Sequence, residues 1–395
     1  MDAIDWRAAQ RVGELIAGSP PYGGVRATSV QPLAYEFAER VGSYSGLAPT
    51  TELPVLEAVD RAMWIEANLK SMRPLLGALT ERMGEGTGPL AGPIRAGSGF
   101  LLGTQIGALT GMLSQRVLGQ YDVALLEAQV APRLLLLAPN LALTARQLAV
   151  DRDELVLWVS IHEITHAVQF SGAPWLREHL AGMLTQLLDG LGVALDGGEE
   201  DEGAGAEGNN GDRAPSNGAG SRAHADDPRP RPAADWWPKL PQVHELRAMV
   251  ERARRGELLR LTLGEERWEL VERMQAAMSL IEGHAEHTMD AIGAEVLPSL
   301  PHLRAAMTRR REHRGLPWRV LERLLGLELK LRQYELGRRF CDAVVEAGGA
   351  EALALAWRSP DSLPRPEELE RPAQWFDRVA RESAPRVDPP RAASV

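Results

Sequence analysis

His162, Glu163 and His166 are the residues of this chain whose types and spacing best predict chemistry. The two histidines are four positions apart, so on an α-helix they share one face, with Cβ atoms about 5–6 Å apart. Two imidazoles placed in this way can bind one zinc ion at about 2.0–2.1 Å. Glu163 is rotated by about 100° from His162, so it faces away from the ligand pair but can accept a proton from a water at the open position. The spacing therefore predicts zinc as the cofactor and Glu163 as the catalytic base.

The residues around this motif are those of a buried helix. Apart from the motif itself, residues 159–168 carry no charge. Asp151 and Asp153 are candidate N-caps of a helix that we expect to run to about residue 170. Two histidines and a glutamate are costly to bury in such a helix unless a partner satisfies them. The alternative to a metal site is a core helix whose histidines are hydrogen-bonded.

A second helix offers the third ligand. Apolar residues at three- and four-residue spacing define a buried stripe over residues 271–292, and Glu282 falls at the edge of that stripe. Gly283 beside it allows another helix to approach closely. We therefore predict that Glu282 is the third protein ligand and that Glu286, one turn on, accepts the free ring N–H of a zinc-bound histidine. The alternatives are that Glu282 pairs with a buried arginine, or that His284 is the ligand.

These residues resemble the site of the zincin metallopeptidases. Residues 282–285, Glu-Gly-His-Ala, are similar to the Glu-Gly-x-Ala setting in which the gluzincin branch places its third ligand. The longer metzincin motif is not matched, because Gln169 and Gly172 stand at the places where it has glycine and histidine. The resemblance is therefore to a gluzincin-like site.

Most of the chain, apart from a low-complexity insertion and the termini, is similar to one actinobacterial group of zincin-like metallopeptidases. These proteins are classed as hydrolases or as deazaflavin-coenzyme-biosynthesis-associated proteins. The segments that carry the resemblance are residues 119–122, 158–170, 281–293 and 330–349. The resemblance implies a zincin-like domain with an active-site helix and a second helix that bears a ligand. It implies no role in making the coenzyme.

The apolar periodicity predicts a mainly helical, α+β fold with a small sheet beside the active-site helix. An apolar run that begins at Arg133 and is closed by Pro139 and Asn140 predicts a buried strand. A glycine recurs at every fourth position from Gly99 to Gly111, which predicts close packing between two helices, with membrane insertion as the alternative. The longest expected helices cover residues 53–81, 151–170, 175–188 and 321–345.

The composition is that of one large domain with an insertion. The chain has 395 residues, of which 44% are hydrophobic, so a sizeable core can form. Residues 196–234 contain almost no large apolar side chain and cannot bury enough surface to offset the entropy of ordering. We therefore expect a single zincin-like domain formed by residues 1–195 and 235–385, a disordered insertion at 196–234 and a disordered tail at 386–395.

Charge and cysteine content exclude several classes of protein. A net charge of -10 argues against a nucleic-acid partner bound by general electrostatic attraction. Cys341 is the only cysteine, which excludes a cysteine-based zinc site and an internal disulfide. No secretory signal opens the chain and no apolar run reaches the length of a membrane span, so we expect a cytoplasmic protein without stable membrane insertion.

These observations predict a zinc-dependent hydrolase whose partner is a peptide or protein substrate cleaved at an amide bond. Zinc would be held by His162, His166 and Glu282, with water as the fourth ligand. A hydrolase of non-peptide amides stays open as an alternative. So does a non-catalytic binding protein in which zinc has a structural role, which would need a fourth protein ligand such as His284.

Two tyrosines are candidates for a supporting role. Tyr121 or Tyr334 is a candidate oxyanion donor, but plain packing is the favoured interpretation of each. The sequence does not indicate an oligomeric state.

Overall fold

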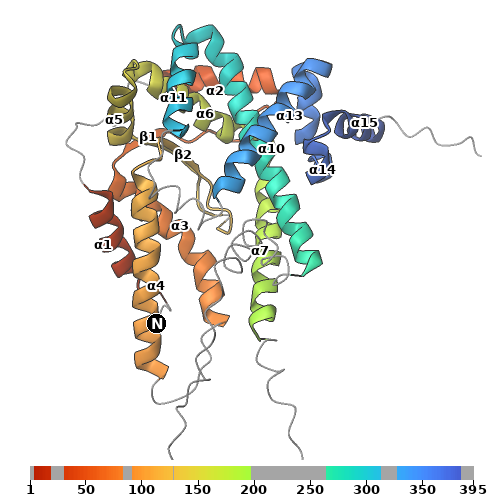
Figure 1. Ribbon diagram of the computed structural model, residues 1–395. Helices are drawn as coiled ribbons and strands as arrows, with labels where there is room; N and C mark the ends of the chain where they lie inside the picture. Colours follow the sequence, from red (N-terminus) through yellow and green to blue (C-terminus); the bar gives the residue numbers. More distant parts are fainter. Residues whose placement is uncertain are drawn as a thin grey trace, which may run out of the picture.

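The computed structural model describes residues 4–18, 31–82, 91–127, 129–196, 264–312 and 327–383. The fold is mainly helical with one small sheet, as the sequence predicts (Figure 1). All of the expected disordered insertion except Asp196 lies outside the described residues, and so does the expected tail at 386–395. The division of the chain into a single domain with an insertion therefore stays a prediction.

Three short strands form the sheet, in the order β1-β3-β2. They are β1 Leu56–Val59, β2 Gly119–Asp122 and β3 Arg133–Leu137. The central strand β3 pairs in parallel with β1 and antiparallel with β2. Alternate side chains of β3 face opposite sides, so Leu134 and Leu136 join one core and Leu135 and Leu137 join another. The outer strand β2 lies beside helix α6, Arg152–Gly172.

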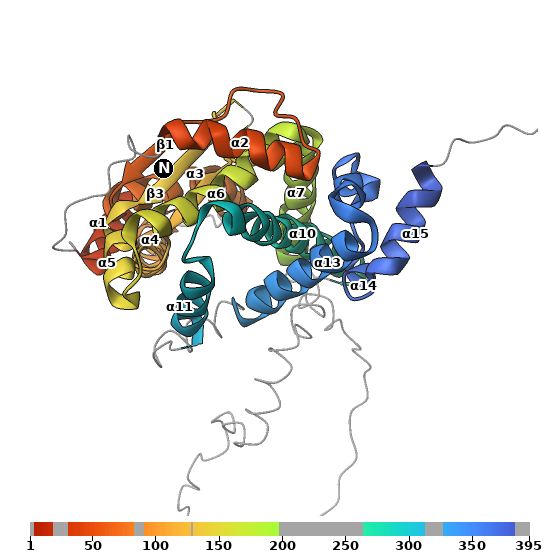
Figure 2. The same ribbon diagram turned by 90° about the horizontal axis from the view of Figure 1, so that it is seen from above.

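On one side of the sheet, the smaller core is covered by three helices: α1 Trp6–Ala17, α3 Arg61–Arg82 and α4 Ala91–Ser114. Helices α1 and α4 lie side by side in both views (Figures 1 and 2). A Cβ added at Gly103, Gly107 or Gly111 of α4 would collide with backbone carbonyls of α1. The close helix packing predicted from the glycine spacing is therefore confirmed.

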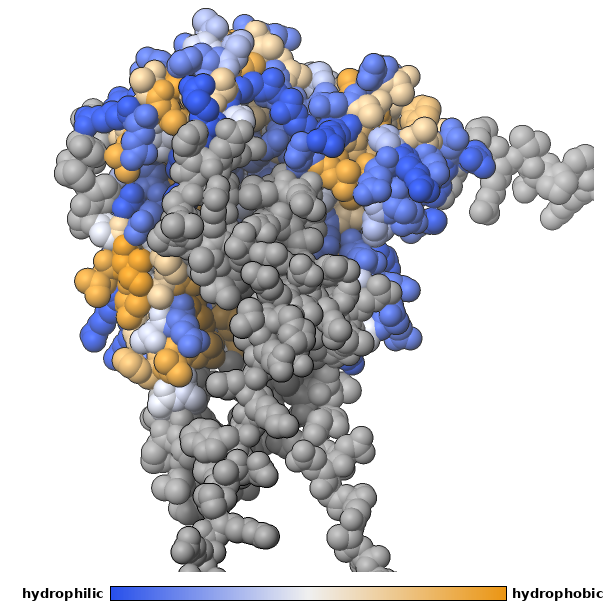
Figure 3. All heavy atoms as spheres, in the orientation of Figure 1, coloured by the Kyte–Doolittle hydropathy of each residue, from blue (hydrophilic) through white to orange (hydrophobic). Residues whose placement is uncertain are grey.

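The outward face of α4 remains apolar. Phe100 and Leu101 are more than half exposed, and Figure 3 shows hydrophobic residues gathered at this side of the molecule. No helix among the described residues is long and apolar enough to cross a membrane.

The larger core is built around α6 and α10. The remaining elements that build or border this part are α2 Gln31–Ser45, α5 Ala138–Leu148, α6 Arg152–Gly172, α7 Trp175–Asp196, α10 Glu265–Val296, α11 Leu300–Glu312, α13 Leu327–Ala354, η2 Leu355–Trp357, η3 Pro360–Ser362, α14 Pro366–Leu369 and α15 Pro372–Ser383. Helix α6 passes against α2, α10 and the sheet. Helix α10 in turn is packed between α6 and α13, as seen from above in Figure 2.

Helix α6 begins where the sequence predicts. Asp151 is its N-cap, and its carboxylate accepts hydrogen bonds from the backbone N–H groups of Asp153 and Glu154, both at 2.9 Å. The helix continues to Gly172, two residues past the predicted end. Most of its side chains are buried on all sides, which the uncharged flanks of the motif indicated.

Several boundaries differ from the sequence-based expectation. The predicted helix over residues 53–81 contains β1, which forms because Leu56–Val59 pairs with β3, and the helix itself begins at Arg61. Pro139 and Asn140 do not close the strand but begin α5, because Pro is well suited to the first turn of a helix. Helix α7 runs on to Asp196, beyond the expected end at residue 188.

Helix α13 also extends beyond its expected end at residue 345. It is helical from Leu327 to Ala354, with a kink at Gly349, whose φ of 76° suits glycine. The expected start at residue 321 lies outside the described residues.

Candidate metal centre

His162 and His166 lie on one face of α6, as their spacing requires. Their Nε2 atoms are 3.3 Å apart and their rings meet edge to face. His166 is buried, whereas the side chain of His162 is 23% exposed, so the pair is reached from the His162 side. The helix therefore presents two ring nitrogens to the same point, close to solvent.

Glu282 brings the third ligand atom from α10. Its Oε2 lies 3.7 Å from Nε2 of His162 and 3.6 Å from Nε2 of His166. A tetrahedral zinc ion with bonds of 2.0–2.1 Å would separate its ligand atoms by about 3.4 Å. The three separations lie within about 0.3 Å of this value, so small movements of the side chains would let them hold a zinc ion. Among the described residues no fourth His, Cys, Asp or Glu joins the three.

The electrostatics of the cluster also fit a cation. Burial alone would raise the pKa of Glu282, but attraction to His166 and hydrogen bonds with both histidines outweigh burial and lower it well below its usual range. Burial alone would lower the pKa of His166, but Glu282 raises it to about 9. In the metal-free chain the carboxylate therefore stays charged and attracts positive charge, either a proton on the histidines or a metal ion in its place.

Glu163 is buried beside the cluster and held by β2. Its side chain accepts a hydrogen bond from the backbone N–H of Tyr121. A Cβ at Gly119 would lie only 2.7 Å from Oε1 of Glu163 and 2.8 Å from Cγ1 of Val159. Glycine at this position therefore leaves the room that the carboxylate occupies.

The hydrogen-bond pattern of the sheet explains why β2 can hold Glu163. Leu137 donates to the carbonyl of Leu118, so along β2 every second residue bonds to β3. The backbone groups of Gly119 and Tyr121 consequently point away from β3, toward the side on which Glu163 lies. The outer edge of the sheet and the buried carboxylate therefore face each other.

The pKa of Glu163 is raised. Burial is the main cause, and the nearby His162 and His166 oppose it. A carboxylate with a raised pKa is a stronger base than an exposed one, which suits a residue that must take up a proton near neutral pH.

Gln169 completes the site, and sequence reasoning did not identify it. Its side chain is fully buried, and its Oε1 lies 2.9 Å from Nδ1 of His166. Its Nε2 lies 2.9 Å from the backbone oxygen of Ile281 and 2.8 Å from Nδ1 of His284. The only sequence signal was a polar residue one turn after His166 in an otherwise apolar helix, because both α10 partners are more than 100 positions away.

The other ionisable residues of α10 are turned to other partners. His284 is fully buried against the ring of Trp357 and bonded to Gln169, so it is not placed as a fourth ligand. The interior position of His284 was not expected from the apolar stripe. It follows from the contacts with Gln169 of α6 and Trp357 of η2, which cover this side of α10. Burial lowers the pKa of His284 to about 3.

Glu286 is half-buried and lies near Arg304, whose pKa is lowered mainly by burial; the charge of Glu286 opposes that shift. Nδ1 of His166, the ring atom that Glu286 was expected to bind, faces Gln169 instead. A role for Glu286 toward His162 stays a prediction. His287 contacts Tyr44 at 2.7 Å and Asp342 at 2.6 Å.

Tyr121 and Tyr334 are the two candidate oxyanion donors. Tyr121 packs its ring against Phe170, with centroids 5.5 Å apart, and burial raises its pKa to about 12. These contacts favour packing, and the contribution of Tyr121 to the site comes from its backbone. The side chain of Tyr334 lies outside the described part of the chain.

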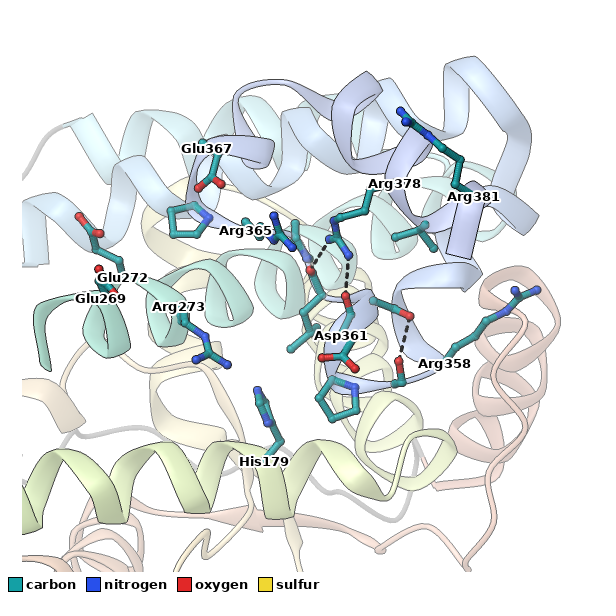
Figure 4. Close-up of a pocket in the computed structure, with 17 residues that line it drawn as sticks. His179, Glu269, Glu272, Arg273, Arg358, Asp361, Arg365, Glu367, Arg378 and Arg381 are labelled. Carbon is teal, nitrogen blue, oxygen red and sulfur yellow. Dashed lines mark hydrogen bonds between the residues drawn. The ribbon is translucent and has the colours of Figure 1, made fainter. Parts of the chain in front are cut away.

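A cavity of about 1350 Å³ lies elsewhere, between α7, α10 and the C-terminal elements. Figure 4 shows Arg273 of α10 directed toward His179 of α7, with Asp361 nearby. Burial and Arg273 lower the pKa of His179. None of the residues of the metal cluster lines this cavity, so its size does not make it the reaction site.

Comparison with known proteins agrees with this geometry. A structure from Chloroflexus aurantiacus, described as a "putative hydrolase with a novel fold", is 25% identical to this chain with a TM-score of 0.62, over 96% of this chain and 99% of that chain. No curated protein matches the chain. The zincin-like metallopeptidase family matches residues 4–376, a range that contains α6, β2 and α10. This chain therefore belongs to the zincin-like metallopeptidase family.

Proposed function

We propose that this protein is a zinc-dependent hydrolase that cleaves amide bonds in peptides. His162, His166 and Glu282 hold the metal, and Glu163 is the catalytic base. The observation that carries the proposal is the convergence of three ligand atoms at 3.3–3.7 Å with a buried carboxylate beside them. Membership of the family and the description of the Chloroflexus aurantiacus protein support hydrolysis as the reaction class.

The chemistry divides between the metal and Glu163. A bound zinc ion supplies a Lewis acid that polarises a carbonyl and lowers the pKa of water. Glu163 takes up the proton of the attacking water and delivers it to the leaving nitrogen. The backbone N–H of Tyr121 keeps the carboxylate in place during both transfers, and Gly119 leaves it room. Gln169 orients His166 through its ring N–H.

The outer strand favours a peptide over other amides. The backbone groups of Gly119 and the carbonyl of Tyr121 point away from β3, and the N–H of Tyr121 is used by Glu163. An extended peptide can therefore add to this edge as a further strand through the remaining groups. Such a peptide would pass along the edge that faces Glu163. The bond to be cleaved would then be delivered to the base by main-chain pairing, which requires no particular side chain on the substrate.

Metal analysis tests the site. Purified protein should contain about one zinc per chain, and His162→Ala should remove it, since two remaining ligands bind zinc weakly. His179→Ala is the matched control, because His179 lies on the next helix and lines the separate cavity. Carefully handled protein without zinc, and unable to take it up, would contradict the proposal.

Glu163→Gln tests the base. The variant should keep zinc and fold, and should lose about 10²- to 10⁴-fold in turnover of a peptide library, because an amide cannot take up the proton. Glu269→Gln, an exposed change on α10, is the control. Equal turnover by Glu163→Gln and wild type would refute the assignment. Cleavage of small acyl amides without cleavage of any peptide would keep the hydrolase and remove the peptide substrate.

A further inference from the structure

The amide of Gln169 forms hydrogen bonds with both His166 and His284. It is buried completely and has three partners: Nδ1 of His166, the backbone oxygen of Ile281 and Nδ1 of His284. A primary amide offers two N–H donors on nitrogen and acceptor sites on oxygen. The three partners therefore use both donors and the acceptor.

The carbonyl of Ile281 decides which way the amide points. A backbone carbonyl can only accept, so the amide group that faces it must be the nitrogen. The reversed amide would set two oxygens against each other in a buried place and leave the donors of Gln169 without these partners. Because Ile281 belongs to the rigid helix α10, this choice is set by the backbone and not by either histidine.

The orientation of the amide then determines the proton positions on two rings. Oε1 faces Nδ1 of His166, so this nitrogen must carry the hydrogen and donate it. The neutral ring then has its lone pair on Nε2, the atom that faces His162 and Glu282. At His284 the situation is reversed, since Nε2 of Gln169 donates to Nδ1 and the ring hydrogen must be on Nε2.

We propose that Gln169 is a positioning residue that, oriented by the carbonyl of Ile281, holds His166 as the Nδ1–H tautomer and His284 as the Nε2–H tautomer. The amide thus leaves the lone pair of His166 on Nε2, where it can bind a metal, and donates a hydrogen bond to Nδ1 of His284. The part of this inference that concerns zinc rests on the proposed function. The two tautomers follow from hydrogen bonding in the metal-free chain.

The tautomers can be measured without metal or substrate. Long-range proton–nitrogen spectra of the metal-free full chain, labelled with ¹⁵N-histidine, distinguish a protonated from an unprotonated ring nitrogen at each position. The chain has 9 histidines, and single His→Ala variants assign the signals. Above pH 9, where His166 no longer carries the additional proton that Glu282 stabilises, we expect His166 as Nδ1–H and His284 as Nε2–H in the wild type. The opposite tautomer at either position overturns the proposal.

Two variants test separately the hydrogen bonds of Gln169 with His166 and with His284. Gln169→Glu keeps an acceptor for His166 but has no donor for His284. Its carboxylate also faces the carbonyl of Ile281, which cannot donate to it, so this variant is compared at the two rings alone. We expect an unchanged His166 signal and a gain of hydrogen on Nδ1 of His284. Gln169→Met has the same length and neither group, so both signals should become mixtures and zinc affinity should fall about 10- to 100-fold.

Gln115→Met is the matched control, because the amide of Gln115 also bonds a backbone carbonyl, that of Ile16, far from the metal cluster. It should leave both histidine signals and the zinc affinity unchanged. Signals of His166 and His284 in Gln169→Met that equal those of the wild type would overturn the proposed role of Gln169. If the wild-type tautomers are as proposed and no zinc binds, the proposed function fails and the role of Gln169 stands. If zinc binds and the tautomers are reversed, only the role of Gln169 fails.

Discussion

Two helix pairs in this protein touch through glycine, and they differ in what the contact positions. Between α1 and α4, Gly107 and its neighbours one turn away rest on the backbone of α1. Between α10 and α13, Gly283 and Gly337 play the same part, each close to the backbone of the other helix. The packing through glycine is the same, but only the second contact lies next to a residue of the candidate metal cluster, Glu282.

The surroundings of the two contacts explain this difference. The α1–α4 contact borders a small core of apolar side chains such as Ala9 and Ile106. In α10 the neighbours of Gly283 are Glu282 and His284, which are costly to bury without partners. Those partners come from a third helix, α6, against which α10 is held. Close helix packing becomes a metal site only where such a third element supplies complementary polar groups.

Removing the carboxylate should have the largest effect. Glu282→Ala takes away one of three predicted ligand atoms, so zinc affinity should fall by more than the ~10- to 100-fold that is typical of losing an outer hydrogen bond to a ligand. Affinity is measured by competition with a chelator. Phe100→Ala on the exposed face of α4 should leave the affinity unchanged. Normal zinc binding by Glu282→Ala would contradict the ligand assignment.

Gly119 differs from the glycines of both helix contacts, because it leaves room for the carboxylate of Glu163 and not for a neighbouring helix. In Gly119→Ala the new methyl group would meet Oε1 of Glu163 at 2.7 Å and displace it. A shift of about 1 Å in a catalytic group costs about 100-fold in rate, so kcat should fall by about that factor with zinc content unchanged. Gly77→Ala, with nothing nearby, is the control. Loss of zinc together with activity would mean that β2 supports the ligands as well.

The pH dependence of the metal-free protein should distinguish the two contacts. Burial acts to lower the pKa of His166, but Glu282 raises it to about 9, against 6.5 in a free chain. The stability from this pair is therefore fully present below pH 6.5 and is lost as the pH rises toward 9, by up to about 3 kcal/mol.

Denaturant unfolding across this pH window is the measurement. Wild type and Gly107→Ala should both lose stability as the pH rises, since the α1–α4 contact does not involve His166. Glu282→Gln should show a flatter profile, because the attraction that raises the pKa is absent. A wild-type profile as flat as that of Glu282→Gln would remove the link between this pair and stability.

Matched glycine substitutions compare the contacts directly. Gly107→Ala and Gly283→Ala both place a methyl group against a neighbouring backbone, and each should destabilise the fold by about 1–3 kcal/mol. Only Gly283→Ala should also weaken zinc binding, since it moves α10 relative to α13 beside Glu282. Thermal unfolding and zinc titration of the folded fraction measure the two effects. Equal zinc affinities in both variants would show that α13 does not position the ligand.

The sequence by itself determined the placement of the candidate ligands that depends on local periodicity. The α-helical repeat puts His162 and His166 on one face and turns Glu163 aside, and Asp151 marks where that helix begins. Glu282 could be placed at the inner edge of α10 because apolar spacing defines that face. Each of these inferences uses residues within a few turns of one another, where helix geometry leaves little freedom.

Tertiary structure decided the features that depend on distant segments. Residues 56–59 became a strand because β3 pairs with them, although their own spacing suggested a helix. His284 was enclosed by Gln169 of α6 and Trp357 of η2, and Gln169 became a partner of His166 because Ile281, 112 positions along the chain, presents its carbonyl there. Local sequence does not specify which backbone group a buried amide meets. That choice is made by the packing of α6 on α10, which buries the amide and requires each of its polar atoms to find a partner.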